Sequence, residues 1–150
     1  MGQQQLILLV LATVIVGIAI VVGIRAFTEN DARANADAMM QDAVHMANDI
    51  QAAVKKPQPF GGVAVIDSVS FGAIGYPNTN NIYTNVNGSF ELSTATAGEV
   101  LITGEGGDNG AGSHAQEVQV RVCGLTDQDI KGAITLVGGQ GTGTTAAPGC

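Results

Sequence analysis

An unbroken apolar run stands near the start of the chain. It extends from Leu6 to Ile24, follows the three glutamines Gln3, Gln4 and Gln5, and precedes the first basic residue, Arg25. As an α-helix, these 19 residues rise roughly 28 Å, which is close to the thickness of the hydrocarbon core of a bilayer. The pattern therefore predicts a helix of membrane-spanning length.

A secretory signal peptide is the main alternative for this segment. Signal peptides combine a basic first region, a shorter apolar core and a cleavage site of small residues. No Lys or Arg precedes Leu6, and the sequence IRAFTEN after the apolar run offers no clean A-x-A site. We therefore expect residues 6–24 to be retained as a membrane helix, with Arg25 at its aqueous boundary.

The helical pattern continues beyond the apolar run. From Phe27 to Lys56 there is neither Pro nor Gly, and apolar residues recur at spacings of three and four, with one adjacent pair. This stripe consists of Ala32, Ala36, Met39, Ala43, Met46, Ala47, Ile50 and Val54. Lys55 and Lys56 suit a helix C-terminus, and Pro57 and Pro59 end the helix. We expect one helix of about 50 residues, apolar all round in its first half and amphipathic in its second.

After Lys56 the hydrophobic period changes from that of a helix to that of strands. Short runs rich in Val, Ile and Thr alternate with clusters of Gly, Asn, Asp and Pro, which are strand and turn signals. The runs cover residues 63–74, 89–95, 98–105, 115–125 and 132–139. They predict an antiparallel β head of about five to seven strands. The expected fold is α+β: a helix over residues 1–56 whose amphipathic half covers one face of a sheet within residues 57–150.

The negative charge of the chain is concentrated in the head. Residues 1–56 carry four Lys and Arg against five Asp and Glu, whereas residues 57–150 carry two against eight. An acidic head with few lysines repels phosphate, which argues against nucleic acid as a partner. No nucleophile–base pair or strong metal-ligand spacing stands out, so we expect neither an enzyme nor a cofactor.

The chain has two cysteines, Cys123 and Cys150. A cysteine at the end of the chain is a poor core residue and would be a reactive thiol if left free, so we expect a disulfide between the two. Such a bond places the head outside a reducing cytosol. On the chain-entropy model it contributes about 3 to 4 kcal/mol by holding a tail rich in Gly and Thr.

The glycine-rich segment GEGGDNGAGSH brings Glu105, Asp108 and Asn109 close together in sequence. Oxygen ligands of this kind suit Ca²⁺, which makes the three residues weak calcium candidates. Their spacing matches no EF-hand, and a solvated turn explains the composition equally well.

Two other polar residues carry less weight. Asn87 begins the tripeptide NGS, an N-glycosylation acceptor pattern that is common by chance. His45 lies within the helical pattern, where a packing or surface role is the simpler interpretation.

The layout of the whole chain resembles that of type IV pilins and their relatives, the pseudopilins and the archaeal adhesion pilins. An apolar helix leads through an amphipathic half into a small β head that ends in a cysteine. Gln5 followed by Leu6 falls where pilins have Glu followed by an apolar residue, and Cys123 and Cys150 resemble the pair that bounds the pilin D-region. The sequence departs from the pilin pattern in its amide at the fifth position and in showing no basic leader that ends in Gly.

The resemblance implies a subunit of an extracellular, adhesive helical filament, with helices bundled in the core and β heads outside. Before assembly, such a subunit resides in the cytoplasmic membrane. A membrane-bound motor and platform then assemble it into a homopolymer. The uncharged tip formed by Gln3, Gln4 and Gln5 suits a helix that enters a filament core, because a buried ion costs far more than a satisfied amide. The other expected core contacts are Leu6, Ala12, Gly17, Ala19 and Gly23, since small residues let helices approach closely.

A different function is also compatible with the sequence. The chain would then be a membrane-anchored extracytoplasmic binding module, with the acidic loop, and calcium within it, as its working part. The two hypotheses differ in whether the apolar helix stays in lipid or leaves it.

Overall fold

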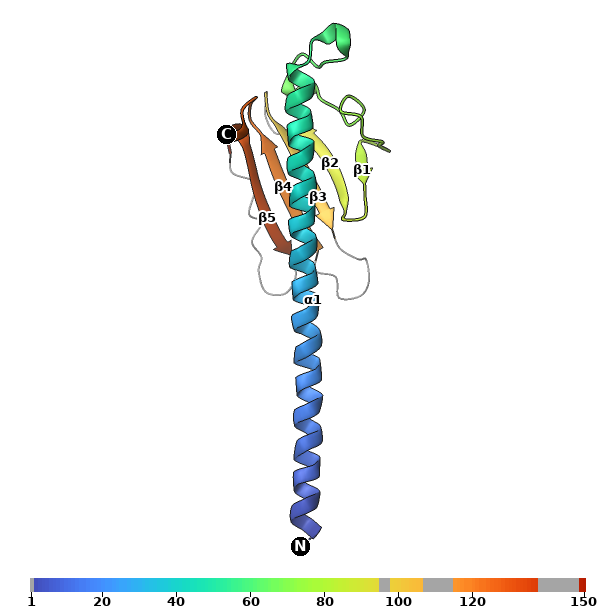
Figure 1. Ribbon diagram of the computed structural model, residues 1–150, viewed down its shortest axis with the longest axis vertical. Helices are drawn as coiled ribbons and strands as arrows, with labels where there is room; N and C mark the ends of the chain where they lie inside the picture. Colours follow the sequence, from blue (N-terminus) through green and yellow to red (C-terminus); the bar gives the residue numbers. More distant parts are fainter. Residues whose placement is uncertain (1, 95–97, 107–114, 138–148) are drawn as a thin grey trace.

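The computed structural model describes residues 2–94, 98–106, 115–137 and 149–150. A single helix, α1 (Gly2–Lys55), is followed by a five-stranded antiparallel sheet that packs against its C-terminal half (Figure 1). The 54 residues of α1 correspond to a length of about 80 Å. The α+β fold expected from the sequence is confirmed, and so is the continuity of the helix.

The sheet is a simple meander in which each strand pairs with the next. The strands are β1 (Ile82–Thr84), β2 (Ser89–Thr94), β3 (Val100–Gly106), β4 (Ala115–Val122) and β5 (Ile130–Val137). Three short 3₁₀ helices lie in the connections: η1 (Gln58–Phe60), η2 (Ile66–Ser68) and η3 (Asp127–Asp129). Every strand pairing is antiparallel, which suits connections made by short turns.

One face of the sheet packs on α1, and its residues follow the strand period of two. In β4, Val118, Val120 and Val122 are buried, whereas Gln119 and Arg121 between them lie on the opposite face. The helix contributes the predicted stripe to the same core, with the fully buried residues Met39, Ala43, Met46, Ala47 and Ile50. The hydrophobic core is therefore shared between α1 and the sheet, and neither is buried without the other.

Two parts of the strand prediction were wrong. Residues 63–74 form no strand; they contain η2 and consecutive turns, with bonds from Val69 N to Ile66 O and from Tyr76 N to Phe71 O. Their buried residues are Ile66, Val69 and Phe71, which do not follow a strict alternation of inward and outward positions. The strand β1 was also missed, because three residues are too few to establish a period.

The connection before β1 is held against α1 by Tyr76. Its hydroxyl donates a 2.8 Å hydrogen bond to Asp49 Oδ2 and lies 3.1 Å from His45 Nδ1. Partial burial and the neighbouring Asp49 carboxylate raise the pKa of Tyr76 above its ordinary value. His45 therefore has a surface role in fixing this connection.

The predicted disulfide between Cys123 and Cys150 is present, with Cα atoms 5.7 Å apart. It brings the C-terminal residue back beside the end of β4. Lys131 Nζ also donates a 2.8 Å hydrogen bond to the carbonyl oxygen of Gly149. The last two residues of the chain are thereby held next to the start of β5.

Candidate functional site

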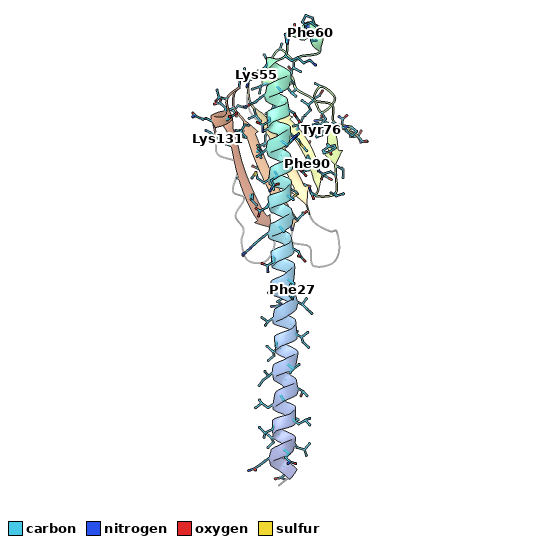
Figure 2. The ribbon with its side chains drawn as sticks, in the orientation of Figure 1. Phe27, Lys55, Phe60, Tyr76, Phe90 and Lys131 are labelled. Carbon is cyan, nitrogen blue, oxygen red and sulfur yellow. A yellow bond between two sulfur atoms is a disulfide. The ribbon has the colours of Figure 1, made fainter. Side chains whose placement is uncertain are left out.

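The N-terminal half of α1 projects away from the head as a bare apolar rod (Figure 2). The large apolar side chains between Leu6 and Ile24 are 52% to 68% exposed, and the first fully buried residue of the helix is Ala36. Folded monomers seldom expose apolar patches beyond roughly 600 Å². This segment, which no described part of the chain covers, needs either lipid or protein around it.

Within the described residues, α1 is the one helix that is long and apolar enough to cross a membrane. Its most apolar window has a mean hydropathy of 3.2 and no residue buried by the rest of the chain. A soluble core helix with such a window would be covered by its own fold. A membrane anchor is thus compatible with the structure.

The tip of the rod carries no ionisable side chain among the described residues. Gln3, Gln4 and Gln5 are all exposed, and none forms a side-chain hydrogen bond with another described residue. Their donors and acceptors are directed to the surroundings of the helix.

No contact among the described residues requires glycine at the two glycine positions of the rod. A Cβ added at Gly17 or Gly23 would meet no atom within 4 Å, and both have ordinary helical backbone conformations. Each glycine inside a helix costs about 1 kcal/mol relative to alanine. Any compensating contact must come from outside the described chain.

The four small residues predicted to pack between helices do not share one face. At 100° per residue, Ala12, Ala19 and Gly23 fall within about 40° of one another, whereas Gly17 lies about 140° away. Gly17 lines a shallow apolar hollow with Thr13, Val16 and Ile20, and Ala12 lies at the border between this hollow and the other face. Two sides of the rod therefore offer small residues to a neighbour.

The face with Ala12, Ala19 and Gly23 continues along the whole helix on the side opposite the sheet. In the head half this face presents small, polar or charged side chains, all exposed: Asn30, Ala34, Asp37, Gln41, Asn48, Ala52 and Lys55. The free side of α1 is visible in Figure 1, where the helix lies in front of the sheet. A second helix could approach α1 closely along this side over much of its length.

A polar network at the lower edge of the head was not foreseen. Asp42 Oδ2 accepts hydrogen bonds from Asn85 Nδ2 at 2.8 Å and from Asn87 Nδ2 at 2.7 Å. Asn35 Nδ2 donates to the carbonyl oxygen of Asn87 and to Gln116 Oε1. The network fixes the turn of residues 85–88, between β1 and β2, against α1. The amide nitrogen of the NGS tripeptide is therefore engaged by Asp42 in the fold.

The calcium candidates are only partly within the described structure. Glu105 lies in β3, where its side chain is exposed and its partners in register are Glu117 and Ser89. Asp108 and Asn109 lie outside the described residues. Among the residues that are described, no group of three or more His, Cys, Asp or Glu could hold a metal ion.

Comparison with known proteins gives no match to any family model, curated protein or solved structure.

Proposed function

We propose that this protein is the repeating structural subunit of an extracellular helical filament. The apolar halves of α1 bundle at the centre and the β heads form the outer layer. The observation that carries the proposal is the bare apolar rod, whose side chains remain more than half exposed beside a well-packed head.

The details of the rod favour a protein neighbour over lipid alone. A lipid anchor does not require the uncharged amides Gln3, Gln4 and Gln5, or glycines that lower helix stability. A helix packed against other helices uses both, because amides can bond across the interface and glycines allow close approach. The free side of α1, which carries small, polar and a few charged side chains, extends this packing surface into the head.

Lipid is as apolar as the rod, so burial of apolar area does not drive the subunit out of the membrane. Packing between helices and bonds between their polar groups must provide the gain, together with an assembly motor and platform in the membrane. We therefore propose that the subunit is located first in the cytoplasmic membrane and then in an extracellular homopolymer.

Electron microscopy of material sheared from expressing cells tests the proposal. Antibodies against the head should label thin filaments along their length, and mass spectrometry should identify this chain as their main component. Cells without the gene should shed no such filaments. If the protein stays in the membrane fraction and no labelled filament is found, the chain is an anchored module instead.

A further inference from the structure

The far end of the head carries a rigid basic and aromatic projection, residues 55–62, called the knob below. Lys55 and Lys56 are exposed, and η1 behind them places Phe60 at the extreme end of the molecule, 72% exposed (Figure 2). Backbone bonds fix its shape: Phe60 N to Pro57 O at 3.0 Å, and Val63 N to Ala53 O at 3.0 Å. Gly61 closes the turn with a positive φ of 85°.

The opposite edge of the head, where the rod leaves the sheet, carries a second exposed surface, called the notch below. Val86, at the tip of the 85–88 turn, is 99% exposed, although Asp42 and Asn35 hold that turn firmly. Asp31 is exposed one helical turn before Asn35, on the same side of α1. Phe27 follows one turn further down and is 73% exposed.

The side chain of Val86 is almost fully exposed on a turn that hydrogen bonds hold in place, and it makes no contribution to the core of the single chain. The same holds for Phe60, which contributes nothing to the core. The ionisable groups of the knob are both cationic, whereas Asp31, on the helix below the 85–88 turn, is an exposed carboxylate. Acids also occur at the far end: Asp127 and Asp129 lie in the connection between β4 and β5, and Glu99 pairs with Arg121.

We infer that the knob of one copy binds the notch of the next copy, an inference that rests on the filament function proposed above. Phe60 packs against Val86, and the two lysines pair with Asp31. The two surfaces differ and lie at opposite ends of the head, so the contact is heterologous and leaves both ends of a chain of subunits open. Such a contact gives a polymer and not a closed dimer.

The geometry of α1 fixes the offset between the joined copies. Asp31 and Lys55 are 24 residues apart, which corresponds to about 36 Å along the helix. This offset exceeds the rise of roughly 28 Å of the apolar run, so the apolar runs of two joined copies do not overlap along the axis. Subunits at intermediate heights must complete the core, and the knob contact joins the heads along the filament axis.

Cysteine cross-linking in assembled filaments tests the contact directly. The described chain has no free cysteine, because Cys123 and Cys150 are paired. Filaments of the double variant Phe60→Cys, Val86→Cys should give a ladder of multimers after mild oxidation, on a gel run without reductant. Each single variant, and the matched control Phe60→Cys, Glu91→Cys, should remain largely monomeric. A ladder that is no stronger than that of this control overturns the contact.

A charge exchange tests the same contact without added thiols. The variant Lys55→Glu, Lys56→Glu should raise the critical concentration for assembly about fivefold to tenfold. Adding Asp31→Lys should restore most of the loss, whereas adding Glu91→Lys, on the face of the sheet that points away from α1, should not. Equal rescue by both changes, or no loss at all, overturns the contact. If the unaltered protein forms filaments and these tests fail, only the contact is wrong; if it forms none, the filament function itself fails.

Discussion

The hydroxyl of Tyr76 donates a 2.8 Å hydrogen bond to Asp49 and ties the connection before β1 to the middle of α1. Tyr76 also joins a row of aromatic rings with Phe71 and Tyr83, whose centroids lie 6.4 Å and 4.9 Å from its own. A connection with little regular structure is thus held by one polar and several apolar contacts to the shared core.

High pH should loosen this connection. Burial and Asp49 raise the pKa of Tyr76 in the folded chain above the ordinary value of about 10. The folded state therefore holds this proton more tightly than the unfolded state, and stability falls as pH rises above about 10. Thermal unfolding of the full chain in detergent, followed by circular dichroism, should show a steeper loss from pH 9 to pH 11 than Tyr76→Phe. Parallel curves for the two proteins would contradict this explanation.

Removal of the Asp42 carboxylate should destabilise the head. Asp42→Ala leaves the amides of Asn85 and Asn87 without their acceptor, at a cost of about 1 to 3 kcal/mol. The free energy of unfolding in urea measures the effect. Asp37→Ala, which removes an exposed acid from the same helix, is the control and should change stability by less than about 0.5 kcal/mol.

A charge at the tip of the rod should block assembly. Gln5→Lys places an ammonium where helices are proposed to bundle, and a buried unpaired charge costs several kcal/mol. The variant should be found in the membrane fraction at normal amounts, with few or no filaments by microscopy. Gln5→Asn keeps the amide and should assemble. A normal filament yield from Gln5→Lys would argue strongly against a buried tip.

Loss of the disulfide should release the end of the chain from β4. Replacing Cys123 and Cys150 by Ser should lower the stability of the head by about 3 kcal/mol. Chemical unfolding measures this loss, and mass spectrometry of the unreduced, digested protein should find the two peptides linked. Free thiols at both positions in fresh extracellular material would contradict an oxidising location.

Calcium should leave the melting temperature almost unchanged. A bound ion at a hundredfold excess over Kd would stabilise the head by about 2.7 kcal/mol. The Gly-rich segment around Asp108 and Asn109 makes the ordering of a site costly, so we expect little difference between calcium and chelator in the full chain. A large upward shift that Asp108→Ala abolishes would instead establish a ligand site.

Much of the fold follows from the periods of the sequence, because each long element has one consistently apolar side. The stripe from Ala36 to Ile50 and the alternation of Val118, Val120 and Val122 both give faces that the structure buries. The disulfide could also be predicted, because the chain has two cysteines. The periods of the helix and of the strands are local in the chain, and tertiary contacts reinforce them.

The polar contacts could not be foreseen in the same way. Asp42 and Asn87 are 45 positions apart, and Asn35 and Gln116 are 81 apart. No period marks such pairs, and Asn, Asp and Gly in this region indicate a turn without indicating what the turn binds. The exposure of Val86 follows from that docking, so the proposed notch was invisible before the structure.

The core shared between α1 and the sheet has a mechanical consequence. A load applied along the rod enters the head through the same continuous helix that carries Met39, Met46 and Ile50 into the core. To pull the helix out of the head, the load must break the contacts of α1 with β3, β4 and β5 together. It does not separate one strand from its neighbour one hydrogen bond at a time. The bond between Cys123 and Cys150 also ties the last residue of the chain to the end of β4. The architecture suits a part that works under tension.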